Sequence, residues 1–361
     1  MTTVAVIGAA GPLGRAVLER LDDAPEVRRV LGVDLTEPEM PVAKLSFRVA
    51  DARDPLLAQA LDGAYVVVHL GPRDFERDSN TMHARAVGGT RNVLAACERV
   101  GARVLVHVSS GSVYGARPDN PISLDESAPL RANTDFAYAH HHRLADELVE
   151  RWAQEHPDVR TVVLRPAVML GPGVQDFVTR HLLSPVMPLV RGYDPPFQAV
   201  HVDDVAAAVA LAATGELAGA YNVAADGWVE LADMCAILGR RPVFVPEQVA
   251  FSGATSLYRH GLMVVPPGAL HYLMHPWVLS SARLHGAGWA PEHSNRETLR
   301  RFAADHAGQV TLGRRSTHVR DLVAAAAALA LAFGGVAVAW RRRRRTRRKR
   351  RGGAAATAAQ P

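Results

Sequence analysis

The chain is poor in cysteine and lacks the patterns that use it. Only Cys97 and Cys235 occur among its 361 residues, and neither belongs to a C-x-x-C pair. This excludes a disulfide framework and a cysteine-based zinc site, and it fits a reducing compartment. The first residues, MTTVAVIGAAG, also lack the basic stretch and long apolar run of a secretory signal. The folded part is therefore expected in the cytoplasm.

Acidic residues are missing from the segment 341–351, RRRRRTRRKRR, which holds ten basic residues. Because the whole chain has a net charge of +5, the rest of it carries −5. A mildly acidic body argues against a surface that grips nucleic acid, so nucleic acid is not an expected partner. Binding of nucleic acid by the arginine run alone stays an alternative.

A glycine-rich turn follows the first apolar stretch. Residues 3–7, TVAVI, have the β-branched composition of a buried strand, and GAAGPLG comes directly after them. Gly8, Gly11 and Gly14 let the backbone approach a pyrophosphate, and Pro12 suits the first position of a helix. The free N–H groups at that helix N-terminus attract a phosphate. The pattern predicts a dinucleotide-binding turn.

An acidic residue ends the next expected strand, residues 30–34. Asp34 lies 20 residues beyond Gly14, where a carboxylate accepts hydrogen bonds from ribose hydroxyls and repels a 2′-phosphate. This favours NAD over NADP, although Asp34 as a simple turn former is the alternative. Further strand-and-helix units follow in register up to the helix that contains Tyr138. The alternation predicts an α/β fold with a Rossmann-like, doubly wound parallel sheet.

Several longer stretches carry a family resemblance over roughly residues 1–305. They are GAAGPLG, ADARD (50–54), VVVHLG (66–71), GGTRNVLAAC (88–97), VHVSSGSVYG (106–115), VVLRPAVMLGPG (162–173), FQAVHVDDVAAAV (197–209) and GAYNVAADG (219–227). In this order they resemble the extended short-chain dehydrogenase/reductase family, of the NAD-dependent epimerase/dehydratase type. The resemblance implies a NAD-binding Rossmann part (1–165), a smaller C-terminal substrate-binding part (166–305) and a homodimer.

The resemblance also implies roles at matching positions. Tyr138 would be the general acid/base and Ser110 would bind a substrate oxygen. No metal ligands are implied. The implied cofactor-binding residues are Gly8, Gly11, Leu13, Gly14, Asp34, Asp51, Ala52, Leu70 and Gly71.

Three positions depart from the family pattern. The lysine of Y-x-x-x-K is His142, the asparagine of the segment before GGT is Ala86, and the substrate-side asparagine after the sixth strand is Val168. A lysine charge at about 4 Å favours a tyrosinate by roughly 4 kcal/mol at an effective dielectric near 20. A histidine titrates near 6.5 and is only partly charged at neutral pH. His142 is therefore interpreted as a third catalytic residue that supports a slower, more pH-sensitive reaction, or else as the mark of a lost one.

The other polar candidates are expected to be structural. On a helix His140, His141 and His142 would each point about 100° away from the residue before, which disfavours a metal site. Packing is expected for His69 and a structural role for Arg165. In the segment HVDDVA an aspartate is expected to cap a helix; the residues concerned are His201, Asp203 and Asp204.

The C-terminal region is expected to attach to a membrane. After a linker (306–321), residues 322–340 contain no charge over 19 positions, and the basic tail (341–361) follows. The tail and the NAD-binding part both belong on the cytoplasmic side, which one crossing does not allow. We therefore expect a hydrophobic helix at the cytoplasmic face, with the arginines on anionic lipids. A soluble cytoplasmic protein is the alternative.

These observations predict a NAD-dependent oxidoreductase or epimerase that acts at a secondary alcohol. The substrate would be a small molecule such as a nucleotide sugar, a lipid-linked sugar or a sterol-like alcohol, a choice that rests on analogy. The first alternative is a NAD-binding scaffold or redox sensor at the membrane that has lost its chemistry. The second is an assembly factor that recruits partners through its arginine tail.

Overall fold

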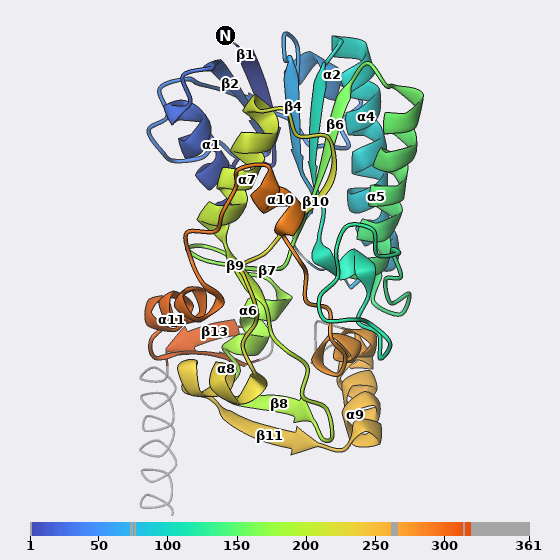
Figure 1. Cartoon of the computed structure of the whole chain (residues 1–361), viewed down its shortest axis with the longest axis vertical. Coiled ribbons are helices and arrows are strands. Elements are labelled where there is room, and N and C mark those ends of the chain that lie inside the picture. The colour runs from blue at the N-terminus through green and yellow to red at the C-terminus, as the bar shows by residue number, and fades with distance from the viewer. Residues whose placement is uncertain (1, 73–74, 76, 261–265, 313–314, 319–361) are drawn as a thin grey trace, which may run out of the picture. The chain divides into compact units, whose positions relative to one another are not determined.

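The computed structural model describes residues 2–72, 75, 77–260, 266–312 and 315–318 (Figure 1). The chain forms two compact units, Met1–Ala307 and Gly308–Pro361. In the second unit β12 (Gln309–Leu312) pairs antiparallel with β13 (Arg315–His318), inside the range predicted as a linker. The sheet and the candidate site belong to the first unit.

Seven strands of the first unit form one parallel sheet in the order β10-β6-β5-β4-β1-β2-β3. Strand order reverses direction at β1 and β4, as it does in a doubly wound fold. The predicted Rossmann-like sheet is therefore confirmed. The strands are β1 (Thr2–Ile7), β2 (Val27–Asp34), β3 (Leu45–Val49), β4 (Val66–Leu70), β5 (Val104–Val108), β6 (Arg160–Pro166) and β10 (Gly219–Val223).

Helices cover both faces of this sheet (Figure 1). One face carries α1 (Pro12–Asp23) and α7 (Val202–Thr214), and the other carries α2 (Leu57–Ala60), α4 (Gly89–Val100) and α5 (Ala137–Glu155). Side chains alternate between two apolar cores along each strand: in β1, Val4 and Val6 join the first core while Ala5 and Ile7 join the second. Burial on both faces explains why the strands are continuously apolar.

Short connecting elements complete the sheet half. They are α3 (Ser79–His83), the π-helix η1 (Ala84–Gly88) and the 3₁₀ helix η2 (Gly111–Tyr114). All three lie close to the carboxyl ends of the strands or to α5, where ligands bind in doubly wound sheets.

The part after residue 166 contains two further strand pairs, β7 (Val168–Leu170) with β9 (Ala199–His201) and β8 (Val186–Val190) with β11 (Arg241–Val245). Between β9 and β11 the chain returns to the seven-stranded sheet, because α7 packs on that sheet and β10 is one of its strands. The part predicted to bind the substrate is therefore interleaved with the part predicted to bind the cofactor rather than strictly following it. Its helices are α6 (Phe177–Leu182), α8 (Leu231–Ile237), α9 (Glu247–Arg259), η3 (Pro267–Leu273), α10 (Ala282–Gly286) and α11 (Asn295–Asp305).

The predicted membrane helix, residues 322–340, and the basic tail, residues 341–361, lie outside the described residues. Within the described ranges, no helix combines the length and the apolar character needed to cross a membrane.

Candidate functional site

The glycine turn joins β1 to α1. Gly8 has a φ of +92°, and a Cβ built on Gly14 would lie 2.2 Å from the Gly8 carbonyl oxygen. No side chain fits at Gly14, because the backbone itself fills that space. Gly11 is the N-cap of α1 and Pro12 its first residue, so free N–H groups face the turn. Leu13 has its side chain in the core, which leaves only its backbone for a ligand.

Asp34 stands at the end of β2 and reaches back to this turn. Its Oδ2 accepts a hydrogen bond from the Ala10 N–H at 2.9 Å, and its Oδ1 accepts one from the Leu35 N–H at 2.7 Å. A carboxylate has four lone-pair positions, so two remain for ribose hydroxyls. The contact with Ala10 ties the acidic residue to the pyrophosphate turn, which the sequence spacing alone did not reveal.

Asp51 and Ala52 follow β3 and are held by neighbours. The Arg53 guanidinium bonds both Asp51 oxygens at 2.8 Å and holds the pKa of that carboxyl below its usual range. The Asn92 amide on α4 donates to the Ala52 carbonyl at 2.8 Å. The segment that would border an adenine is thereby fixed on both sides.

Leu70 and Gly71 connect the glycine turn to the candidate catalytic residues. A Cβ on Gly8 would meet Leu70 Cβ at 3.2 Å, and one on Gly71 would meet the His142 ring at 3.5 Å. These residues, together with the glycine turn and Asp34, form a continuous path along the carboxyl ends of β1, β2 and β4. The path has the glycines, the acid and the close backbone approach that a dinucleotide requires, so the residues present fit NAD.

Tyr138 and His142 lie one turn apart on α5. Their ring centroids are 4.4 Å apart, and both side chains are buried. The His142 Nε2 lies 2.9 Å from the Pro72 carbonyl oxygen. Because a carbonyl only accepts, Nε2 carries the proton in this contact. His142 is thus anchored to the backbone beside Gly71.

Ser110 follows β5 and serves as the N-cap of η2. Its hydroxyl accepts from the Ser112 N–H at 3.3 Å and lies 2.9 Å from the Ser112 hydroxyl. Since η2 packs against α5, the cap places Ser110 on the same side of the sheet as the tyrosine helix. Its hydroxyl is bonded to Ser112 rather than to Tyr138.

The two other departures from the family pattern are apolar and buried. Ala86 is fully buried in η1, and the Thr90 hydroxyl donates to its carbonyl at 2.6 Å. A π-helical turn at such a position is frequently associated with function. Val168 joins the apolar cluster of the substrate part with Leu170 and Leu182.

A buried polar network links α5 to the sheet, and most of it was not predicted from the sequence. Arg165 donates from Nε to Asp146 at 2.7 Å and from Nη1 to the Tyr114 hydroxyl at 3.0 Å. Asp146 lies one turn after His142 on α5. The i, i+4 spacing of Tyr138, His142 and Asp146 was therefore the sequence signal that could have indicated this network. Arg165 is structural here, as expected.

Beside this network, the His69 and His107 rings meet through their Nδ1 atoms at 3.1 Å. Burial lowers the pKa of His69 well below its usual range and that of His107 to about 3. Both rings are therefore neutral and packed in the sheet.

The contacts of His140 and His141, the two residues directly before His142, do not indicate a role in catalysis. His141 lies 3.1 Å from the Ser79 hydroxyl, and burial lowers its pKa to about 4. Burial also lowers the pKa of His140. In the described part of the chain, no three potential metal ligands gather at one point.

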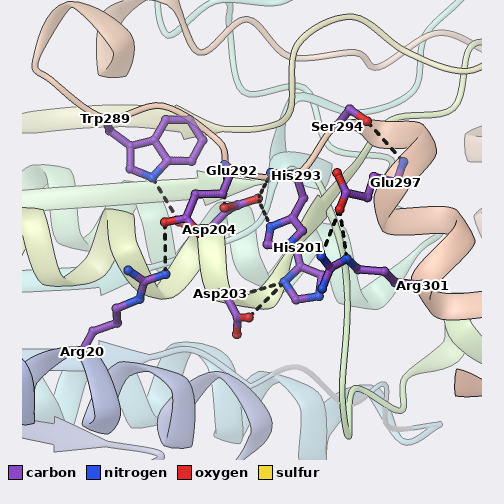
Figure 2. A network of polar contacts seen from close by, with 10 residues as sticks. All are labelled: Arg20, His201, Asp203, Asp204, Trp289, Glu292, His293, Ser294, Glu297 and Arg301. Atoms are coloured by element: carbon purple, nitrogen blue, oxygen red, sulfur yellow. Dashed lines mark hydrogen bonds and ion pairs between the residues drawn. The ribbon is translucent and has the colours of Figure 1, made fainter.

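A second polar network lies between α7 and the segment before α11 (Figure 2). The Asp204 carboxylate accepts from the Glu292 N–H at 2.9 Å and the His293 N–H at 3.2 Å, and Trp289 donates to the Asp204 carbonyl at 3.0 Å. The expected aspartate cap is wrong in detail: the N-cap of α7 is His201, whose ring accepts from the Asp203 N–H. Asp204 instead ties two segments together.

Comparison with known proteins places this geometry in a family context. Residues 4–224 match the model of the NAD dependent epimerase/dehydratase family. The match confirms the family resemblance, NAD as the cofactor and the class of enzyme predicted from the motifs.

Individual relatives agree with the family match. An uncharacterized protein of Mycobacterium tuberculosis is 30% identical over 253 residues, 67% of each chain. A 2-alkyl-3-oxoalkanoate reductase of Shewanella oneidensis is 28% identical over 276 residues, 68% of this chain and 69% of the reductase. The structure of a Thermotoga maritima UDP-glucose 4-epimerase with UDP-glucose has a TM-score of 0.64 at 19% identity, covering 84% of this chain and 97% of the epimerase. That last likeness concerns the fold alone.

Proposed function

Because the chain belongs to the NAD dependent epimerase/dehydratase family, we propose that it is an oxidoreductase or epimerase acting at a secondary alcohol. The observation that carries this proposal is the contact between Tyr138 and His142, whose rings lie 4.4 Å apart next to Gly71. A proton-transferring tyrosine beside the path that fits a dinucleotide is the arrangement such a reaction needs.

The residues divide the work as follows. The glycine turn binds the pyrophosphate, and the Asp34 carboxylate accepts hydrogen bonds from the ribose hydroxyls. When bound, NAD supplies the acceptor for a hydride from the substrate carbon. Tyr138 takes the proton from the substrate hydroxyl, and Ser110 orients the same oxygen with the hydrogen-bonding capacity that its cap leaves free.

His142 assists Tyr138 through its fixed position. Its Nε2–H is committed to the Pro72 carbonyl, so the ring is held against the tyrosine without the freedom of a lysine chain. A proton on Nδ1 would give the ring a positive charge that stabilises the tyrosinate as it forms. We propose that this makes the reaction more pH-dependent than one with a lysine.

Two measurements test the proposed function. Denaturing the purified chain and analysing the released small molecules by mass spectrometry should reveal NAD or NADH. Tyr138→Phe should lower kcat by about 10²- to 10⁴-fold, the usual worth of a positioned acid/base, with NADH affinity unchanged. Full activity in Tyr138→Phe would contradict the assignment.

The second candidate is a NAD-binding scaffold or redox sensor without turnover. The replacement of three polar family positions by His142, Ala86 and Val168 favours it. His142→Lys separates the two: if turnover exists only in this variant, the natural site is a relic. If the natural chain turns over a substrate that the variant does not, His142 is a specialised catalytic residue.

Three further features stay predictions from the sequence. We propose a homodimer, with a nucleotide sugar or a lipid-linked alcohol as substrate, and attachment to the cytoplasmic face of a membrane through residues 322–361. Sedimentation with anionic vesicles tests the attachment; a full-length chain that remains in the supernatant would contradict it. Trimming residues 341–361 tests the assembly-factor alternative, which requires cofactor affinity to survive while function is lost.

A further inference from the structure

Tyr138 lies in a cluster of aromatic side chains drawn from four separate segments. The cluster consists of Phe75, Phe136, Tyr138, Phe177 and Tyr272. The Tyr138 ring centroid is 5.8 Å from that of Phe136 and 5.2 Å from that of Phe177. Phe136 is in turn 5.4 Å from both Phe177 and Tyr272. Apart from His142, the rings around the proposed acid/base are therefore those of phenylalanine and tyrosine.

Two members of this aromatic cluster are half-buried and form its open rim. Phe177 begins α6 and Tyr272 lies in η3, whereas Phe75 and Phe136 are almost completely buried. The substrate part of the chain thus contributes the accessible rings, and the cofactor part contributes the buried ones. Phe177 is therefore a partly exposed ring that also contacts Tyr138.

Several polar groups around the aromatic cluster are already hydrogen-bonded to the protein, whereas the buried His181 Nε2, on the same helix as Phe177, has no hydrogen-bond partner among the described residues. The Tyr272 hydroxyl donates to the Ser112 carbonyl at 2.8 Å, and the Tyr258 hydroxyl donates to the Arg77 carbonyl at 3.1 Å. The Asn133 side chain bonds both the N–H and the carbonyl of Ala116. These groups would have to break internal bonds before they could receive the ring hydroxyls of a sugar.

Val168 extends this apolar character into the substrate part. It is buried in one cluster with Leu170 and Leu182, and Leu182 belongs to the same helix as Phe177. A valine offers no hydrogen bond at the position where the family resemblance implied an asparagine. Sugar hydroxyls in this region would be removed from water without a partner, at a loss of about tenfold in affinity or more for each.

We infer that the site selects a secondary alcohol carried by an apolar carbon skeleton, such as a fused ring or a branched alkyl chain, over a nucleotide sugar. This inference rests on the oxidoreductase function proposed above. The carbinol oxygen is received by Tyr138 and Ser110, and the skeleton packs on the partly exposed rings of Phe177 and Tyr272. Apolar contact with these rings supplies the binding free energy that hydroxyl contacts supply for a sugar.

The test uses the full-length chain loaded with NAD or NADH. Turnover and equilibrium binding are measured with a 3-hydroxysteroid, a 2-alkyl-3-hydroxyalkanoate, UDP-glucose and UDP-galactose. We expect kcat/KM and affinity to be at least about tenfold higher for one of the two apolar alcohols than for either nucleotide sugar. A higher value for a nucleotide sugar in both measurements would overturn the inference and leave the proposed function intact.

A pair of variants assigns the selection to the aromatic cluster. Phe177→Ser should raise KM for the apolar alcohol about tenfold to a hundredfold with kcat changed less than about threefold, because it removes binding but no proton transfer. Phe251→Ser, the same change at a half-buried ring outside the cluster, should leave KM unaltered. Equal effects of the two variants would overturn the role of Phe177.

Measuring equilibrium binding as well as turnover separates the inferred selectivity from the proposed catalytic function. If the chain holds NADH and binds the apolar alcohol but turns over none of the four compounds, the proposed function fails and the selectivity stands. If it binds none of the four in the NADH-loaded state, the selectivity fails as well. Where the natural chain binds the apolar alcohol, Phe177→Ser should lose that binding while its unfolding by urea stays unchanged.

Discussion

The cofactor edge and the catalytic helix of this site are built by different means. Along the cofactor edge, backbone groups and glycines do most of the work: Gly8, Gly14 and Gly71 are each so close to another strand or turn that a side chain would collide. On α5 the proposed catalytic residues are side chains: the Pro72 carbonyl holds the His142 ring, and aromatic neighbours surround the Tyr138 ring. The cofactor edge keeps the glycines of the family pattern, whereas α5 departs from that pattern at His142.

The difference shows which positions tolerate change. A backbone cradle fails with almost any substitution, because no side chain fits where two main chains touch. A side-chain constellation can exchange one member for another of similar reach, provided the surrounding contacts adapt. The His142 Nε2 contacts the Pro72 carbonyl, and that contact keeps a side chain shorter than lysine in a defined place.

The largest effect is expected at the cofactor edge. Gly14→Val would place a side chain within 2.2 Å of the Gly8 carbonyl oxygen, so NADH affinity should fall by about a hundredfold or the chain should fail to fold. Fluorescence titration with NADH checks the affinity and circular dichroism checks the fold. Gly253→Ala on α9, where nothing lies within 4 Å, is the control and should change neither. Normal affinity in Gly14→Val would contradict the cradle.

A smaller effect is expected where a side chain contributes to that edge. Asp34→Asn keeps an acceptor for the Ala10 N–H but removes the charge that holds the ribose and repels a 2′-phosphate. NADH should bind about tenfold more weakly, and the preference for NADH over NADPH should narrow. Parallel titrations with the two cofactors measure both changes. An unchanged preference would mean that Asp34 only stabilises the turn.

The smallest effect concerns the scaffold beneath α5. His107 is neutral in the folded chain because burial lowers its pKa to about 3, while in the unfolded chain it titrates near 6.5. The unfolded state therefore binds the extra proton, and the stability that His107 contributes above pH 6.5 is lost as the pH falls towards 3. Below pH 6.5 the loss steepens, and it approaches about 1.4 kcal/mol per pH unit near pH 5.

Urea unfolding at several pH values measures this slope. His107→Phe should reduce the slope by about that amount whatever the variant does to the stability at pH 7. An identical slope would show that His107 is protonated in the folded state as well, and the histidine pair would then belong with the catalytic helix rather than the scaffold.

Much of the cofactor edge could be predicted from local sequence. Gly8, Gly11 and Gly14 between a strand and a helix specify a tight turn, and the alternation of apolar strands with helices specifies the parallel sheet. The aromatic cluster could not be predicted this way, because Phe75, Phe136, Phe177 and Tyr272 lie far apart in the chain. The interleaving of α7 and β10 with the substrate part was missed for the same reason.

The sequence by itself determined the turn, the sheet and the identity of the candidate residues, since these depend on spacing within one strand, one helix or one βα unit. Only the tertiary structure decided what those residues contact. The Pro72 carbonyl meets His142, the Ala10 N–H meets Asp34, and Phe177 meets Tyr138 across segments whose proximity no local pattern encodes. Chain folding brings such partners together through the packing of whole elements, and the chemistry of the site follows from those contacts.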